Sequence, residues 1–146
     1  MAGIYIHIPF CKKACNYCNF HFSTSLASKD QLIEAIKEEL RMQAKYLQEH
    51  TVETIYFGGG TPSLLSPEEL LSIFASVERY YTIDKLKEFT LEANPDDLDA
   101  AYLTALRKTP INRLSIGVQS FKEADLLFMN RAHTVQQVDY ALKCAQ

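Results

Sequence analysis

Strand-like and helix-like segments alternate along the whole chain, and this order limits the fold more than any other feature. The strand-like segments mix β-branched and aromatic residues and end at Gly, Asn, Gln or just before Pro; they are residues 3–8, 53–59, 88–94 and 113–119. Helical patterns follow them at residues 28–48, 66–81, 98–108 and 134–145. This β-α-β-α-β-α-β-α order predicts an α/β fold with a parallel sheet and right-handed helical crossovers.

Two of the predicted helices begin with a capping signal. Ser28 followed by Gln31 fits a capping box, and Ser66 followed by Glu69 fits one with Pro67 in the first turn. Four βα units are too few to close an eight-stranded barrel. The pattern therefore leaves two architectures open, a small open α/β sheet and a fragment of a barrel.

The overall composition suits a single domain with its own core. Of the 146 residues, 47% are hydrophobic, and the formal net charge is -3. No block of Lys and Arg offers the basic surface that nucleic acid requires. No apolar run approaches the roughly 18 residues of a membrane span, and the N-terminus lacks the features of a secretory signal. We therefore predict a cytoplasmic protein, in which thiols stay reduced.

Residues that could bind a metal or a ligand occur where the predicted strands end. The first strand leads into a loop with three cysteines, the second into the sequence GGGTP at 58–62, the third carries Glu92, and the fourth ends in Gln119. Arg131 follows about a helix-length later. Ligand sites in parallel α/β folds lie at the carboxyl ends of the strands, so we expect these residues to share one rim of the sheet.

The cysteine loop predicts a metal centre. Cys11, Cys15 and Cys18 are spaced C-x3-C-x2-C, and thiolates bind soft metals and iron–sulfur clusters. Three local thiolates on a four-iron cluster would leave one iron open to a substrate. The alternative is structural zinc with His21 as the fourth ligand. The fourth cysteine, Cys144, lies on the last predicted helix and is typical of a buried core thiol.

The glycine-rich turn and the charged residues each allow a structural and a functional interpretation. The turn lacks the Lys-Ser/Thr of a phosphate-binding loop, yet its glycines would let a ligand approach the backbone. Glu92 in an apolar strand must face a polar cavity or pair with a cation, and Arg113 and Arg131 are the candidates for a salt bridge. Arg131 could clamp a carboxylate, but taken alone it is better interpreted as an exposed arginine at the start of a helix. We assign no catalytic residue, and none of the histidines receives a catalytic role.

Taken together, the motifs resemble those of the radical S-adenosylmethionine superfamily, in particular its oxygen-independent coproporphyrinogen III oxidase-like branch. The motifs are YIHIPFCKKACNYCNF, FGGGTPSLL, LEANP, IGVQSF and NRAHT, in that order between residues 3 and about 134. The oxidase of this branch has a further cysteine two residues after the third, and Phe20 stands at that position here. The resemblance is therefore to the heme-chaperone type.

The resemblance implies cofactors and a ligand set. Cys11, Cys15 and Cys18 would hold a 4Fe-4S cluster, and S-adenosylmethionine would chelate the fourth iron. The residues that match contacts to S-adenosylmethionine are Tyr5, Tyr17, Gly59, Gly60, Thr61, Glu92, Gln119 and Arg131. The family's chemistry is reductive cleavage of the sulfonium to a radical, with an electron donor for the cluster. Oxidoreductase activity of this chain is left open.

For the whole protein, the resemblance implies transfer of heme to an acceptor protein. The first alternative is the porphyrin-biosynthesis oxidase itself, and an alternative of another class is a zinc-stabilised α/β binding module. The family's barrel has six βα units, so residues 1–146 are expected to be the N-terminal portion of its core, with the last strands and a C-terminal domain outside this chain. The resulting unpaired sheet edge predicts self-association.

Overall fold

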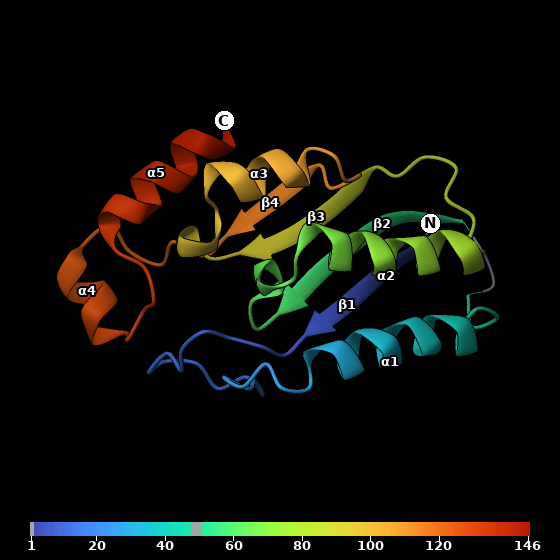
Figure 1. Ribbon diagram of the computed structural model, residues 1–146, viewed down its shortest axis with the longest axis horizontal. Coiled ribbons are helices and arrows are strands. Elements are labelled where there is room, and N and C mark those ends of the chain that lie inside the picture. Colours follow the sequence, from blue (N-terminus) through green and yellow to red (C-terminus); the bar gives the residue numbers. More distant parts are fainter. Residues whose placement is uncertain (1, 48–50) are drawn as a thin grey trace.

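A computed structural model describes residues 2–47 and 51–146 as one parallel sheet with helices between the strands. The strands are β1 (Ala2–Ile8), β2 (Val52–Gly59), β3 (Glu88–Ala93) and β4 (Arg113–Ile116). They pair in sequence order, β1-β2-β3-β4, and all three pairings are parallel. The four arrowheads in Figure 1 therefore point to the same end of the sheet. The predicted α/β fold is confirmed.

Within residues 2–47 and 51–146, five α-helices and two short 3-10 helices accompany the strands. The α-helices are α1 (Lys29–Met42), α2 (Pro67–Tyr80), α3 (Ala100–Leu106), α4 (Glu123–Phe128) and α5 (Val135–Ala145). The 3-10 helices η1 (Pro62–Leu64) and η2 (Pro95–Asp97) follow β2 and β3 directly. Figure 1 shows α4 and the loop after β1 beyond the carboxyl ends of the strands, which is where the rim of the sheet was expected to carry a site.

The two faces of the sheet differ completely. On the covered face, alternate strand residues such as Ile55, Phe57, Phe89 and Leu91 are at most 1% exposed and join the buried side chains of α1, α2 and α3 in one core. Their neighbours, such as Tyr56 and Glu92, lie on the open face. Because side chains alternate along a strand, one register places the aliphatic and phenylalanine side chains toward the helices. Residue Cys144 of α5 packs at the margin of this core and is only partly buried, whereas a buried core thiol was predicted.

The capping signals had different outcomes. At the start of α2, the Glu69 backbone N–H donates to Ser66 Oγ at 3.2 Å and the Glu69 carboxylate accepts from the Ser66 N–H at 2.7 Å, so this predicted capping box is confirmed. Ser28 precedes α1 with φ −102° and ψ 10°, and its side chain makes no capping bond. The backbone at Ser28 lacks the extended conformation that a capping residue needs, so the box predicted with Gln31 is wrong.

Two predicted boundaries differ from the structure by more than two residues, and one helix was not predicted. Helix α1 ends at Met42 rather than at 48, and residue 48 lies outside the described residues. Strand β4 ends at Ile116, since the chain turns at Gln119, whose φ of 66° is left-handed and cannot continue a strand. Helix α4 was not predicted; at six residues it is too short to show a clear helical period. Within the described residues, no helix has both the length and the apolar character needed to cross a membrane.

Candidate functional site

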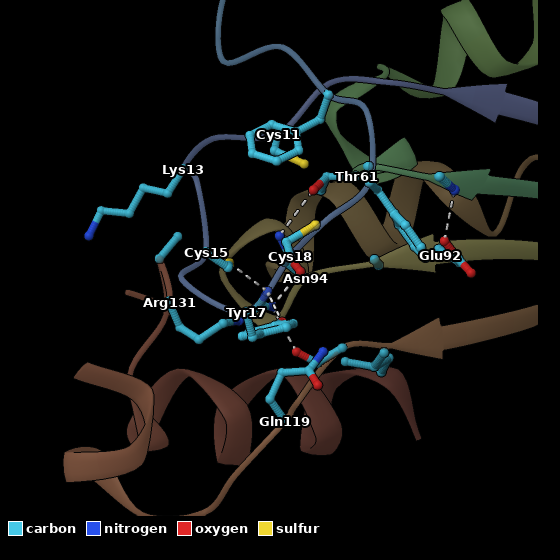
Figure 2. Close-up of a pocket in the computed structure, with 18 of the residues that line it drawn as sticks. Cys11, Lys13, Cys15, Tyr17, Cys18, Thr61, Glu92, Asn94, Gln119 and Arg131 are labelled. Atoms are coloured by element: carbon cyan, nitrogen blue, oxygen red, sulfur yellow. Dashed lines mark hydrogen bonds between the residues drawn. The ribbon is translucent and has the colours of Figure 1, made fainter. Parts of the chain in front are cut away.

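A cavity of about 410 Å³ opens at the carboxyl ends of the strands. It collects all but one of the predicted site residues: Cys11, Cys15, Tyr17, Cys18, Gly59, Gly60, Thr61, Glu92, Gln119 and Arg131. These residues come from the loops after β1 and β2, from β3, and from the segment after β4. In Figure 2 the three cysteines lie around one region together with Thr61, Asn94 and Arg131. The sheet thus brings distant motifs to one rim, as parallel strands predict.

Tyr5 lies beside this cavity rather than in its lining. It points to the open face of β1, is 58% exposed, and its hydroxyl lies 3.1 Å from His7 Nδ1. Its ring stacks on Tyr56, with 5.9 Å between the ring centroids. A Cβ on Gly58 would lie 2.8 Å from the Tyr5 ring, so the glycine is what lets this ring approach β2. Tyr5 therefore borders the site through the open face.

The cysteine loop and the glycine turn pack directly on each other. A Cβ on Gly60 would lie 2.5 Å from the carbonyl oxygen of Phe10 and 2.9 Å from Cys11 Sγ, so only glycine allows this approach. Burial raises the pKa of the Cys11 thiol, as do the neighbouring Cys18 and Cys15, while a hydrogen bond from Thr61 and the charge of Arg131 act in the opposite direction. The glycines thus place Cys11 against the end of β2.

The three cysteines do not form a ready site for a single ion. Thiolates on one Zn²⁺ lie about 2.3 Å from the metal, which brings their sulfurs within about 4 Å of one another. In the part of the chain that the structure describes, no three His, Cys, Asp or Glu side chains are grouped closely enough to hold one ion. All three cysteines nevertheless line the same cavity, whereas His21 is exposed and outside its lining. The ligand set required by the zinc alternative is therefore not formed.

Glu92 faces the cavity from β3 with both carboxylate oxygens engaged. Tyr56 donates its hydroxyl to Oε1 at 2.6 Å, and the Gly59 backbone N–H donates to Oε2 at 3.1 Å. Gly59 has a φ of 115°, a conformation that favours glycine. Among the described residues Glu92 forms no ion pair, because Arg113 pairs with Glu88 instead and Arg131 is bound elsewhere. Of the two interpretations offered for Glu92, the structure has the one in which it faces a polar cavity.

Arg131 connects the cysteine loop to the ends of β3 and β4. Its Nη2 donates to Asn94 Oδ1 at 2.7 Å and to the Gly117 carbonyl at 2.9 Å. Its Nη1 donates to Tyr17 Oη at 3.2 Å and lies 3.4 Å from Cys15 Sγ. The Nε atom is buried and has no hydrogen-bond partner among the described residues. Arg131 is thus a cation inside the site, and the alternative of an exposed arginine at a helix start is wrong.

His133 lies beside Arg131 and is buried. It is 2% exposed, and its Nε2 lies 3.1 Å from the Val118 carbonyl oxygen. Because a carbonyl can only accept, Nε2 carries the proton, and the unprotonated Nδ1 lies 3.5 Å from Arg131 Nη2. Burial lowers the pKa of His133, the charge of Arg131 adds to this, and the hydrogen bond to Val118 opposes it. The imidazole is therefore neutral in the folded protein near pH 7.

Two groups of contacts in the site were not predicted. Asn94 accepts from Arg131 and donates from Nδ2 to Thr61 Oγ1 at 3.3 Å, which joins the ends of β2 and β3 to Arg131. Its position directly after a strand in LEANP was the available signal. Asn16 and Asn130 hold the cysteine loop against the end of α4. No signal pointed to this contact, because α4 itself had not been predicted.

Comparisons with known proteins agree with this geometry. The chain is 39% identical over 134 residues to the heme chaperone HemW of Lactococcus lactis, covering 92% of this chain and 35% of the relative. It is 37% identical to HemW of Bacillus subtilis over 94% of this chain and 37% of the relative. The chain therefore spans about a third of the length of these curated relatives.

Solved structures show the same arrangement of strands and helices. The coproporphyrinogen III oxidase HemN of Escherichia coli, described as a radical SAM enzyme, matches with a TM-score of 0.86 and 28% identity over 97% of this chain and 33% of that protein. The cobalamin-dependent S-adenosylmethionine radical enzyme OxsB shares the fold at a TM-score of 0.62 and 16% identity. The profile of the radical SAM superfamily itself matches residues 5–146. This match covers nearly every residue of the sheet and of the site, and the chain belongs to the radical SAM superfamily, as its motifs predicted.

Proposed function

We propose that this chain binds a 4Fe-4S cluster through Cys11, Cys15 and Cys18, with S-adenosylmethionine beside it. Family membership implies these two cofactors, and the residue assignment is supported by one observation: the three cysteines line the same cavity as the glycine turn, Glu92 and Arg131. When bound, the two cofactors supply the reductive cleavage chemistry of the family. The protein's own part is to hold, orient and shield them.

Each side chain has a task that follows from its chemistry. The three thiolates are soft ligands for iron. The Glu92 carboxylate, fixed by Tyr56 and Gly59, is positioned to accept a hydrogen bond from the amine of S-adenosylmethionine. The guanidinium of Arg131 offsets the negative charge of the thiolates.

The experiment is anaerobic reconstitution with iron and sulfide. We expect about four irons and four sulfides per chain, and a change in the EPR spectrum of the reduced cluster when S-adenosylmethionine is added. Cys11→Ala, Cys15→Ala and Cys18→Ala should each lose most of the iron. Cys144→Ala is the matched control, because Cys144 packs at the core margin on α5, and should retain it. Equal iron in Cys15→Ala and wild type would contradict the assignment.

We further propose that the whole protein is a heme chaperone rather than an oxidase. The relatives named HemW support this, as does Phe20, which lines the cavity at the position where the oxidase type has a further cysteine. The test adds hemin to the reconstituted protein, follows the Soret band, and then offers apomyoglobin as an acceptor. Transfer of heme supports the chaperone. Release of carbon dioxide from a porphyrinogen, without transfer, would favour the oxidase.

Location, domain organisation and association are proposed on narrower grounds. A cytoplasmic location is supported by the four cysteines, which are all free. The proposal that these four βα units belong to a larger six-unit core is supported by the match to a third of HemN. Strand β4 pairs only with β3 among the described residues, and its free side supports self-association. Light scattering tests this: a monomer that stays monomeric at high concentration would contradict it.

A further inference from the structure

We propose that Asn16 and Asn130 form a clasp that positions the cysteine loop for its cluster before iron binds. This inference rests on the proposed function of that loop. The Asn16 backbone N–H donates to the Met129 carbonyl at 3.0 Å, and its Nδ2 donates to the Phe128 carbonyl at 2.7 Å. In return, Asn130 Nδ2 donates to the Ala14 carbonyl at 2.8 Å. These three hydrogen bonds, here called the asparagine clasp, lie on both sides of Cys15.

The backbone at Asn130 explains why an asparagine stands there. Its φ of 55° is left-handed, a conformation that asparagine tolerates better than most residues. The turn ends α4, since the N–H groups of Asn130 and Arg131 donate to the carbonyls of Leu127 and Leu126 at 3.0 and 2.9 Å. The same turn directs the Asn130 amide to Ala14 and the next side chain, Arg131, to Cys15. One left-handed residue thus serves both contacts with the loop.

The middle of the cysteine loop depends on this clasp more than its base does. At the base, the Cys11 N–H donates to the Ser23 carbonyl at 3.0 Å, and Lys12 pairs with Asp96 at 2.8 Å. For residues 13–17, the hydrogen bonds to distant parts of the described chain all go to residues 128–131. The loop has no helix or strand of its own here. Loss of the clasp should therefore release Cys15 and leave Cys11 in place.

Three variants each remove one side-chain hydrogen bond of the clasp while preserving the fold. Asn130→Gly deletes the amide and keeps a residue that adopts the left-handed conformation freely. Asn130→Asp keeps the size of the side chain and its tolerance of that conformation, but has no donor for Ala14. Asn16→Ala removes the bond to Phe128. The matched control is Asn19→Ala, an exposed asparagine in the same loop for which no side-chain hydrogen bond occurs within the described residues.

The first measurement is limited trypsin digestion of the iron-free protein, with the products identified by mass spectrometry. We expect cleavage after Lys13 to become roughly three- to tenfold faster in the clasp variants, as the loss of a hydrogen bond that opposes local opening predicts. Cleavage after Lys37, which lies in α1, should not change. Asn19→Ala should match wild type at both sites. If all sites become faster together, the asparagines stabilise the fold generally and the clasp proposal is wrong.

The second measurement is the initial rate of iron uptake during anaerobic reconstitution. The clasp variants should take up iron several-fold more slowly than wild type and Asn19→Ala. Cleavage after Lys13 and iron uptake at wild-type rates in Asn130→Gly and Asn130→Asp would overturn the clasp. Failure of the wild type itself to bind iron would instead overturn the proposed function, and the trypsin result would still decide whether the asparagines hold the loop.

Discussion

The covered face and the open face of the sheet use the same strands for opposite purposes. The covered face is a continuous apolar core in which Phe57 and Phe89 stack with 5.5 Å between their ring centroids. The open face carries hydrogen-bonded polar groups, such as Tyr56 with Glu92 and Arg113 with Glu88. The hydrophobic effect has no preferred direction, whereas each hydrogen bond requires a particular distance and angle. The residues that stabilise the fold and the residues that shape the site thus lie on opposite faces of the same strands. Single substitutions can therefore test the two contributions separately.

The largest effect is expected on the covered face. Phe57 is fully buried between the sheet and its helices, so Phe57→Ala should lower the free energy of unfolding by about 3–5 kcal/mol through lost burial and a cavity. Urea denaturation monitored by circular dichroism measures this. A cost below about 1 kcal/mol would mean that the core can collapse around the gap and that the covered face does not carry the stability of the domain.

This difference between the faces also explains what the sequence could predict. Runs of β-branched and aromatic residues that end at turn residues identified all four strands, and the Ser66 box identified the start of α2, because both are local signals. The end of β4 was misplaced, since the left-handed turn at Gln119 depends on neighbouring elements.

The site was predictable to the extent that motifs placed residues at strand ends. Parallel topology alone brings the cysteine loop, the glycine turn and Glu92 to one rim. The partners of Arg131 could not be predicted, because Asn94 and Cys15 are distant in sequence and reach it only through the folded ends of β3 and α4. The clasp residues were missed for the same reason.

A smaller effect is expected where the polar rim contains buried charge. Lys12 pairs with Asp96 at 2.8 Å and with Asp97, and these carboxylate side chains are 8% and 5% exposed. Lys12→Met would leave both carboxylates without this cation and should lower the free energy of unfolding by about 1–3 kcal/mol. The loss is smaller than for a fully buried ion pair because the Lys12 side chain is 39% exposed. Lys37→Met, which breaks a surface pair with Glu34, is the control and should cost less than about 0.5 kcal/mol.

The same ion pairs predict an alkaline dependence. Burial lowers the pKa of Lys12, but the hydrogen bonds to Asp96 and Asp97 outweigh it, so the pKa is raised above 10.5. Because the folded pKa exceeds the unfolded one, this stabilisation is complete below pH 10.5 and is lost as pH rises through the folded pKa. Urea denaturation between pH 8 and 11 should show that the free energy of unfolding falls less with rising pH in Lys12→Met than in wild type. Parallel plots of this free energy against pH would contradict the role given to the Lys12 ion pairs.

On the open face, Tyr56→Phe provides the direct comparison with its neighbour Phe57. The substitution removes the hydroxyl donor to Glu92 and keeps the ring. It should therefore lower the free energy of unfolding by about 0.5–1.5 kcal/mol. The hydrogen bond to Glu92, together with burial, raises the pKa of Tyr56 above 10.0, so its contribution is present below pH 10.0 and disappears as pH rises further. Binding of S-adenosylmethionine, measured by equilibrium dialysis on the reconstituted protein, should weaken more than in Phe57→Leu, in which Glu92 keeps its donor.

The smallest effect is expected at His133 and concerns the stability of the protein at acidic pH. Its folded pKa lies below 6.5, chiefly because the imidazole is buried, so the unfolded chain takes up a proton first as pH falls. The stabilisation is present above pH 6.5 and declines below it, by at most about 1.4 kcal/mol per pH unit. His133→Gln retains an N–H donor for the Val118 carbonyl but cannot titrate, so melting temperatures between pH 7.5 and 5.5 should fall less steeply than in wild type. His21→Gln changes an exposed histidine and should retain the wild-type slope; if the two variants behave alike, the buried imidazole is not what makes the rim sensitive to acid.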